Sequence, residues 1–205
     1  MSATAGLFPN RTSPGPAGHH HVVAVSFVIL TELMLFCGLV AAYIVLRGQA
    51  MEWPPAGQPR LPVGITALST LLLLGSGWRV HQLSQFVGRR DVVAVRRLLR
   101  QTVMLGAAFF LIQGAEWGML LGHGLTTASS VYGATFYTIV GCHAVHVLAG
   151  LAALMVVARR VGQLNQPEGD TATFDSWASP VLGARLFWLF VVGVWPPLYA
   201  LVYLW

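Results

Sequence analysis

Residues 131–158 read VYGATFYTIVGCHAVHVLAGLAALMVVA and contain no Asp, Glu, Lys or Arg. An α-helix rises about 1.5 Å per residue, so roughly 20 apolar residues cross the hydrocarbon core of a bilayer. This stretch exceeds that length, and it lacks the alternating polarity of a membrane β-strand. It therefore predicts a membrane-spanning α-helix and determines the class of fold.

Four further apolar runs of similar length lie at about residues 22–46, 62–80, 101–122 and 180–203. The chain of 205 residues is 56% hydrophobic and only 9% charged, whereas a soluble domain carries about 25% charged residues. A soluble globular enzyme is thereby excluded. The sequence predicts an all-α polytopic membrane protein, with a polar tail over residues 1–21 and a five-transmembrane-helix bundle over residues 22–205. The first residues lack an apolar core, so no cleavable signal peptide is expected.

All twelve basic residues are arginine, and the formal net charge is +5. The side that holds the amino terminus receives most of them: Arg11, Arg79, Arg89, Arg90, Arg96, Arg97, Arg100, Arg159, Arg160 and Arg185. The opposite side receives only Arg47 and Arg60. The positive-inside rule then predicts a cytoplasmic amino terminus and a periplasmic carboxyl terminus. We interpret these arginines as determinants of the orientation in the membrane, so no nucleic-acid partner is expected.

The stretch from His81 to Arg100 alternates apolar and basic positions and is expected to lie along the cytoplasmic headgroups.

Two carboxylates fall within the apolar runs, Glu32 in the first and Glu116 in the third. A charged carboxylate at the bilayer centre costs at least about 2.5–3.5 kcal/mol, so each must be protonated or partnered. Two interpretations stand for each: a proton-linked or lipid-linked site, or a protonated acid that bonds across helices. Gln113, three residues before Glu116, shares its helix face and is placed to hydrogen-bond to it.

His143 and His146 are three residues apart in the fourth run and can project from one helix face. At about 1.5 Å per residue, Glu32 and His143 lie at similar depths, so a contact between them is compatible with the sequence. A metal site needs three or four ligands at suitable spacing, and two helical histidines are a weak signal. No Cys-x-x-Cys-His motif exists for a covalent haem. We therefore predict no metal, no cofactor and no catalytic residue in this chain, and we read Cys37 and Cys142 as small apolar side chains.

Several motifs identify a family. Residues 130–136 (SVYGATF) and 141–147 (GCHAVHV) resemble the S-x-Y-G-x-x-F and G-F-H-G-x-H-V segments of subunit III of haem–copper terminal oxidases. Residues 113–117 (QGAEW) resemble the Q-x-x-E-[YW] segment of that family, residues 27–36 (FVILTELMLF) its S-E-x-M-F-F helix, and residues 53–55 its W-P-P loop. The similarity covers nearly the whole chain after residue 20, in order, and the length is similar to that of the short five-helix bacterial form.

The resemblance implies an accessory subunit, itself non-redox, of a proton-pumping cytochrome c or quinol oxidase of aerobic respiration in the bacterial cytoplasmic (inner) membrane. Its implied partners are the catalytic subunit I, other subunits of the respiratory complex and membrane lipids. Haem and copper are expected in the partner subunits, and bound phospholipid in this chain. Support of the catalytic subunit would come through packing, lipid binding, or proton or oxygen access. The candidate lipid-linked or proton-linked residues are Glu32, Glu116, His143, His146 and Gln113.

The last helix departs from the family pattern W-H-F-x-D-x-x-W. Within residues 187–195, Leu189 replaces the histidine and Val192 replaces the aspartate, so the polar cluster expected there is missing. This departure indicates a divergent branch and leaves open a subunit-III-like protein of a nitric oxide reductase. Two alternatives from other classes also stand: a small proton-coupled transporter that uses Glu32 and Glu116, and a di-histidine b-type cytochrome.

Overall fold

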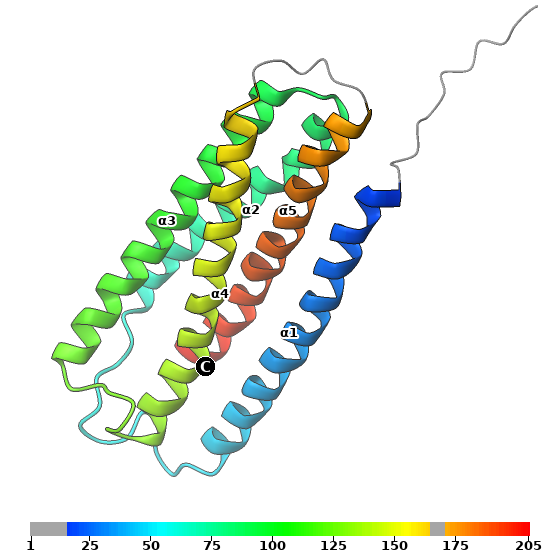
Figure 1. The fold of residues 1–205 in the computed structure, drawn as a ribbon. Helices are drawn as coiled ribbons and strands as arrows, with labels where there is room; N and C mark the ends of the chain where they lie inside the picture. Colours follow the sequence, from blue (N-terminus) through cyan, green and yellow to red (C-terminus); the bar gives the residue numbers. More distant parts are fainter. Residues whose placement is uncertain (1–15, 165–170) are drawn as a thin grey trace, which may run out of the picture.

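The computed structural model describes residues 16–164 and 171–205, and this part of the chain is helical, without β-strands (Figure 1). The helices are α1 (Pro16–Gly48), α2 (Val63–Gly88), α3 (Val92–Gly122), α4 (Val131–Gly162) and α5 (Thr171–Tyr199), and a π-helical segment η1 (Ala200–Leu204) ends the chain. Each of the five α-helices contains a span long and apolar enough to cross a membrane. The prediction of a five-helix membrane fold is confirmed.

The second and third helices extend beyond their predicted bounds. α2 continues to Gly88 and α3 begins at Val92, so the stretch from His81 to Arg100 consists of the end of α2, a turn and the first residues of α3. Its contact with the headgroups stays a prediction. A tight turn joins the two helices: Arg90 has a positive φ of 56°, and the Asp91 carboxylate caps α3 by accepting from the Ala94 amide at 2.9 Å. Outside the hydrocarbon a helix can carry polar residues without a desolvation cost, so hydropathy alone does not show where it ends.

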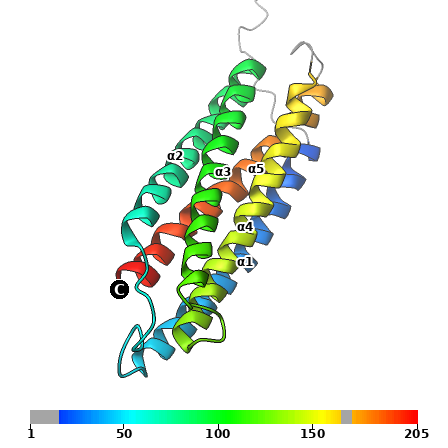
Figure 2. The same cartoon turned by 90° about the vertical axis from the view of Figure 1, so that its left-hand side faces the viewer.

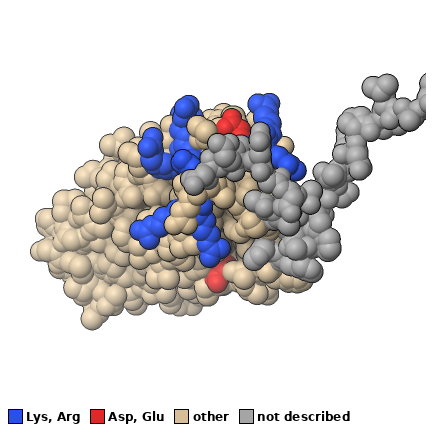
Figure 3. All heavy atoms as spheres, turned by 45° about the horizontal axis from the view of Figure 1, so that its top comes forward, with Lys and Arg blue, Asp and Glu red and all other residues tan. Residues whose placement is uncertain are grey.

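Arginine side chains gather at one end of the bundle. The start of α1, the α2–α3 turn and the end of α4 lie at this end, and the loops at 49–62 and 123–130 lie at the other (Figures 1 and 2). Figure 3 shows the basic side chains seen from the first end. Of the arginines that the structure describes, only Arg47 and Arg60 belong to the opposite end of the bundle. The bundle is therefore strongly asymmetric in charge along its axis.

α5 occupies the centre of the bundle and α1 its edge. α5 contacts α1, α2 and α4, whereas α1 contacts mainly α5 (Figure 1). Only 6% of the most apolar window of α1 is buried inside the chain, against 39% for α4 and α5. Most of the surface of α1 is thus free to contact lipid or another protein.

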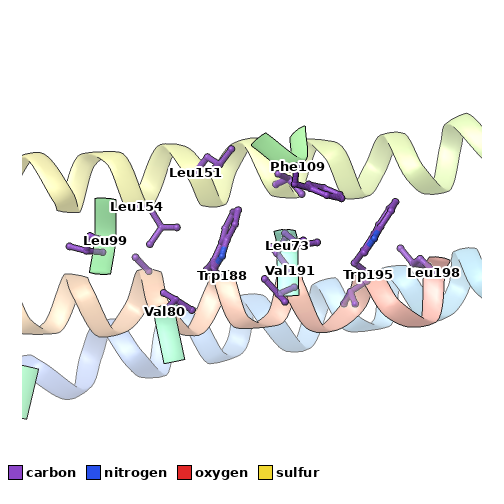
Figure 4. Packing of buried hydrophobic residues seen from close by; sticks show 14 of the residues in the cluster. Leu73, Val80, Leu99, Phe109, Leu151, Leu154, Trp188, Val191, Trp195 and Leu198 are labelled. Atoms are coloured by element: carbon purple, nitrogen blue, oxygen red, sulfur yellow. The ribbon is translucent and has the colours of Figure 1, made fainter. Parts of the chain in front are cut away.

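The indole of Trp188 in α5 holds three neighbouring helices together. It lies against Gly106 of α3 and Gly150 of α4, where an added Cβ would approach the indole to 2.6 Å and 2.7 Å respectively. Its Nε1 donates to Ser76 Oγ of α2 at 3.0 Å. Figure 4 shows the indole projecting from α5 toward α4. Two glycines are needed here because small residues let membrane helices approach closely around a large side chain.

Candidate functional site

Glu32 of α1 and His146 of α4 form the main polar contact at the edge of the bundle. Glu32 Oε2 lies 2.9 Å from His146 Nε2, and the side chains are 29% and 12% exposed. The other ring nitrogen, Nδ1, lies 2.7 Å from the carbonyl oxygen of Cys142 in the same helix. Aromatic rings flank the imidazole, with Phe36 at 5.1 Å and Phe187 at 6.5 Å between ring centroids.

This geometry determines how many protons the pair needs. The Cys142 carbonyl can only accept, so His146 Nδ1 must carry a hydrogen and donate it. The contact between Nε2 and Glu32 then needs one further proton, either on His146 or on the carboxyl group. In both arrangements the pair has no net charge, which removes the cost of an isolated charge in the hydrocarbon. The contact between Glu32 and His146 therefore requires one hydrogen between Nε2 and Oε2.

His143 does not take part in that pair, although the sequence allowed a contact with Glu32. Its imidazole is 1% exposed and stacks on Trp195 of α5, with 4.8 Å between centroids and an interplanar angle of 27°. Phe36 and Phe109 each approach it edge-on, with centroids 6.3 Å away. Three residues along a helix rotate a side chain by about 60° from its original direction. His146 consequently faces α1, while His143 faces the interior.

Glu116 is completely buried in a second polar network. One carboxylate oxygen accepts from Thr66 Oγ1 of α2 at 2.7 Å, and the other accepts from the Tyr203 hydroxyl of η1 at 2.9 Å. Gln113 Nε2 donates to the same Tyr203 hydroxyl at 3.1 Å. Gln113 and Glu116 thus share the Tyr203 hydroxyl as a hydrogen-bond partner. Sequence analysis did not find Thr66 or Tyr203, because an isolated threonine and a terminal aromatic have no distinguishing pattern.

The departures in the last helix are accommodated by apolar packing. Val192 is 6% exposed, and its Cγ1 would lie 2.8 Å from a Cβ added at Gly77 of α2. Leu189 is half-buried beside the same core. Apolar side chains therefore fill the positions that carry a histidine and an aspartate in the family pattern.

A groove of about 480 Å³ runs between α1, α4 and α5. Apolar side chains dominate its lining, and a single guanidinium group, that of Arg160, stands at the arginine-rich end; the lining residues are Val25, Val28, Ala149, Ala153, Val156, Val157, Arg160, Pro180, Gly183, Ala184 and Phe187. The groove therefore combines an apolar lining with one cation at its end.

The surroundings of the two α4 histidines bear on whether this chain could hold a metal or a haem. No group of three or more His, Cys, Asp or Glu side chains gathers in the part of the chain that the structure describes. Both ring nitrogens of His146 are already engaged. His143 is enclosed by aromatic rings beside a cavity of only about 40 Å³, far smaller than a haem. The arrangement does not fit the paired histidines of a b-type cytochrome.

Fold and site together define a polytopic helical membrane protein with two internal carboxylate networks. The family model of cytochrome c oxidase subunit III matches residues 17–205. A probable cytochrome c oxidase subunit 3 of Mycobacterium leprae is 35% identical over 187 residues, which cover 89% of this chain and 88% of the relative. Cytochrome c oxidase subunit 3 of Corynebacterium diphtheriae is 33% identical, covering 89% and 88%, and that of Thermostichus vulcanus is 30% identical, covering 91% and 90%.

The chain belongs to the cytochrome c oxidase subunit III family. It is an accessory subunit of a haem–copper oxidase of the respiratory chain. The resemblance found in the sequence motifs is confirmed.

Proposed function

We propose that this subunit supports catalytic subunit I of a bacterial terminal oxidase without taking part in electron transfer. The Glu32–His146 pair is the observation that carries the proposal. The pair joins α1 to α4 by a hydrogen bond, and aromatic rings flank the imidazole. This arrangement suits a stabilising contact between the peripheral α1 and the rest of the chain.

The proposed orientation places the arginine-rich end in the cytoplasm and the carboxyl terminus in the periplasm of the bacterial cytoplasmic membrane. The support is the concentration of arginines at the end that holds the start of α1 and the α2–α3 turn. Positively charged loops remain on the cytoplasmic side during insertion.

The proposed lipid site is the groove between α1, α4 and α5. An acyl chain would lie along its apolar lining and the headgroup phosphate would meet Arg160, which is exposed at the end of α4. A lipid held there would fill the space beside α1, which the rest of the chain leaves largely uncovered. Bound phospholipid is therefore part of the proposed support.

The oxidase chemistry is assigned to partner subunits. Haem and copper would be held there, and oxygen would be reduced to water with electrons from cytochrome c or a quinol. The names of the relatives favour this oxidase over a nitric oxide reductase or a transporter. A further proposed role of this chain is to provide protons or oxygen with access to the catalytic subunit.

The test is affinity purification of the tagged chain from its own membranes in mild detergent. We expect haem–copper oxidase subunits to co-purify, with oxygen reduction by the complex. Removing the chain should leave the initial rate largely intact but shorten the inactivation half-time during turnover. A stoichiometric haem that stays with the separated chain would contradict a non-redox role, and co-purification of a nitric oxide reductase instead would contradict the assignment to an oxidase.

A further inference from the structure

A polar groove lies between α2 and α3 near the arginine-rich end of the bundle, where the two helices run side by side (Figures 1 and 2). Its volume is about 560 Å³. The lining residues are Arg79, Gln82, Phe86, Asp91, Val93, Ala94, Arg97, Leu98 and Gln101. None of them belongs to the groove between α1, α4 and α5, so the two grooves are separate.

The spacing of the lining residues brings two arginines to one part of the groove. Residues three or four positions apart share a helix face, so the lining forms one stripe on each helix. The turn is centred on Arg90, so residues equally far from it, such as Arg79 and Gln101, lie at about the same level. Arg97 is four residues nearer the turn than Gln101, which is about 6 Å along the helix. The guanidinium groups of Arg79 and Arg97 therefore border the same part of the groove.

These two arginines have no partner in the part of the chain that the structure describes. Neither Arg79 nor Arg97 makes a hydrogen bond or an ion pair there. Other arginines at this end of the bundle do have internal contacts. Arg96 donates to two carbonyl oxygens at the end of α4, at 3.2 Å each, and Arg90 lies over an aromatic ring of α5, 4.7 Å from its centroid. Contacts within the bundle thus account for Arg90 and Arg96 but not for Arg79 and Arg97.

The remaining polar groups of the groove favour an anion. Two arginines and one aspartate give the lining a formal charge of +1. The carboxylate of Asp91 lies at the turn and already accepts from the Ala94 amide at 2.9 Å. Gln82 and Gln101 add side-chain amides, which can donate to an anion.

We propose that this groove binds a phosphate group between the guanidinium groups of Arg79 and Arg97. The planar donors of a guanidinium match phosphate oxygens in bidentate pairs. Counted from Val63 at the start of α2, Arg79 lies about 24 Å along the helix, near the end of a hydrocarbon core of about 30 Å. Phospholipid headgroups lie just beyond that core, and basic pockets between membrane helices bind them. Free phosphate from the aqueous side presents the same chemistry, so the test separates the two sources.

The test uses the purified complex after detergent washing, with two probes. Binding of phosphatidylglycerol is measured by native mass spectrometry, and binding of inorganic phosphate by isothermal titration calorimetry. We expect at least one probe to bind saturably. Arg79→Gln and Arg97→Gln should each weaken that binding by about tenfold, because each removes a charged donor. Both variants should assemble, since neither side chain bonds within the described part of the chain.

Arg100→Gln is the matched control, because Arg100 is an exposed arginine of α3 that does not line the groove. It should bind both probes as the unsubstituted complex does. Loss of phosphatidylglycerol binding alone would identify a lipid headgroup, and loss of inorganic phosphate binding alone a soluble ligand. Equal binding in Arg79→Gln, Arg97→Gln and Arg100→Gln would overturn the proposal. An electron microscopy map that shows a carboxylate of a partner subunit between the two guanidinium groups would overturn it as well.

Discussion

The carboxylate of Glu32 in α1 meets the imidazole of His146 in α4, with 2.9 Å between Oε2 and Nε2. α1 is the least buried helix of the bundle, so this contact ties a peripheral element to the core. His146 Nδ1 also bonds to the Cys142 carbonyl, so both ring nitrogens hold the imidazole in place.

Glu32→Ala should leave the complex assembled and its initial oxygen reduction largely unchanged. Loss of one hydrogen bond costs about 0.5–1.5 kcal/mol, which should shorten the inactivation half-time by about two- to tenfold. Glu32→Gln should be milder, because its amide can still donate to His146 Nε2. Thr31→Ala is the control, since that hydroxyl is exposed and bonds only within its own helix, to Val28. If Glu32→Ala abolished the initial rate with normal assembly and haem content, a direct proton pathway would replace the supporting role.

Two glycines beside Trp188 should not tolerate a methyl group. Gly106→Ala and Gly150→Ala would each place a Cβ within 2.7 Å of the indole, and overpacking of this kind typically costs about 1–3 kcal/mol. Gly118→Ala, also in α3, meets nothing within 4 Å and should be neutral. Thermal dissociation of the chain from the purified complex measures the difference. Equal midpoints for the three variants would show that Trp188 does not fix the helix spacing.

Tyr203→Phe should destabilise the bundle through the Glu116 network. It removes the donor to Glu116 and the acceptor of Gln113 while both stay buried, and unsatisfied buried groups cost about 1–3 kcal/mol. Tyr199→Phe is the matched control, since its hydroxyl bonds one backbone carbonyl at an exposed position, that of Val63. The same thermal assay should show the smaller shift for Tyr199→Phe. The reverse order would mean that the network around Glu116 contributes little to stability.

The lipid proposal predicts different behaviour for two neighbouring arginines. Arg160 lines the groove between α1, α4 and α5, whereas Arg159 does not. Arg160→Ala should lower the amount of anionic phospholipid that stays with the complex through detergent washing, and Arg159→Ala should not. Mass spectrometry of the retained lipid measures this, and equal retention in both variants would remove Arg160 from the lipid site.

The orientation can be tested by cysteine labelling in intact cells, in a background without Cys37 and Cys142. Arg89→Cys in the α2–α3 turn should resist a membrane-impermeant reagent, because positively charged turns stay in the cytoplasm. Ala56→Cys, exposed in the loop between α1 and α2, should react. Labelling at position 89 from outside would show that the whole chain has the opposite orientation, since the helices alternate in direction.

Composition and order along the chain determined the class of fold, the number of helices and the family. An apolar run such as residues 131–158 must form a helix in a bilayer, because only internal hydrogen bonds satisfy its backbone there. The motifs around His143 and Glu116 occur in family order, and they identified the chain without knowledge of its packing. The extent of α2 and α3 was underestimated, because Arg96 and Arg97 continue a helix that hydropathy does not detect outside the hydrocarbon.

Tertiary structure alone decided which polar groups meet. Glu32 and His143 had suitable depths, yet the rotation of α4 turned His146 toward α1 and His143 toward Trp195. Thr66 and Tyr203 are far from Glu116 in sequence and reach its carboxylate only because α2, α3 and the end of α5 converge. Hydropathy depends on the residues within one segment, whereas these contacts depend on how separate helices are rotated and spaced. One determinant of that spacing is the packing of Gly106 and Gly150 against Trp188, which exists only when the helices are placed together.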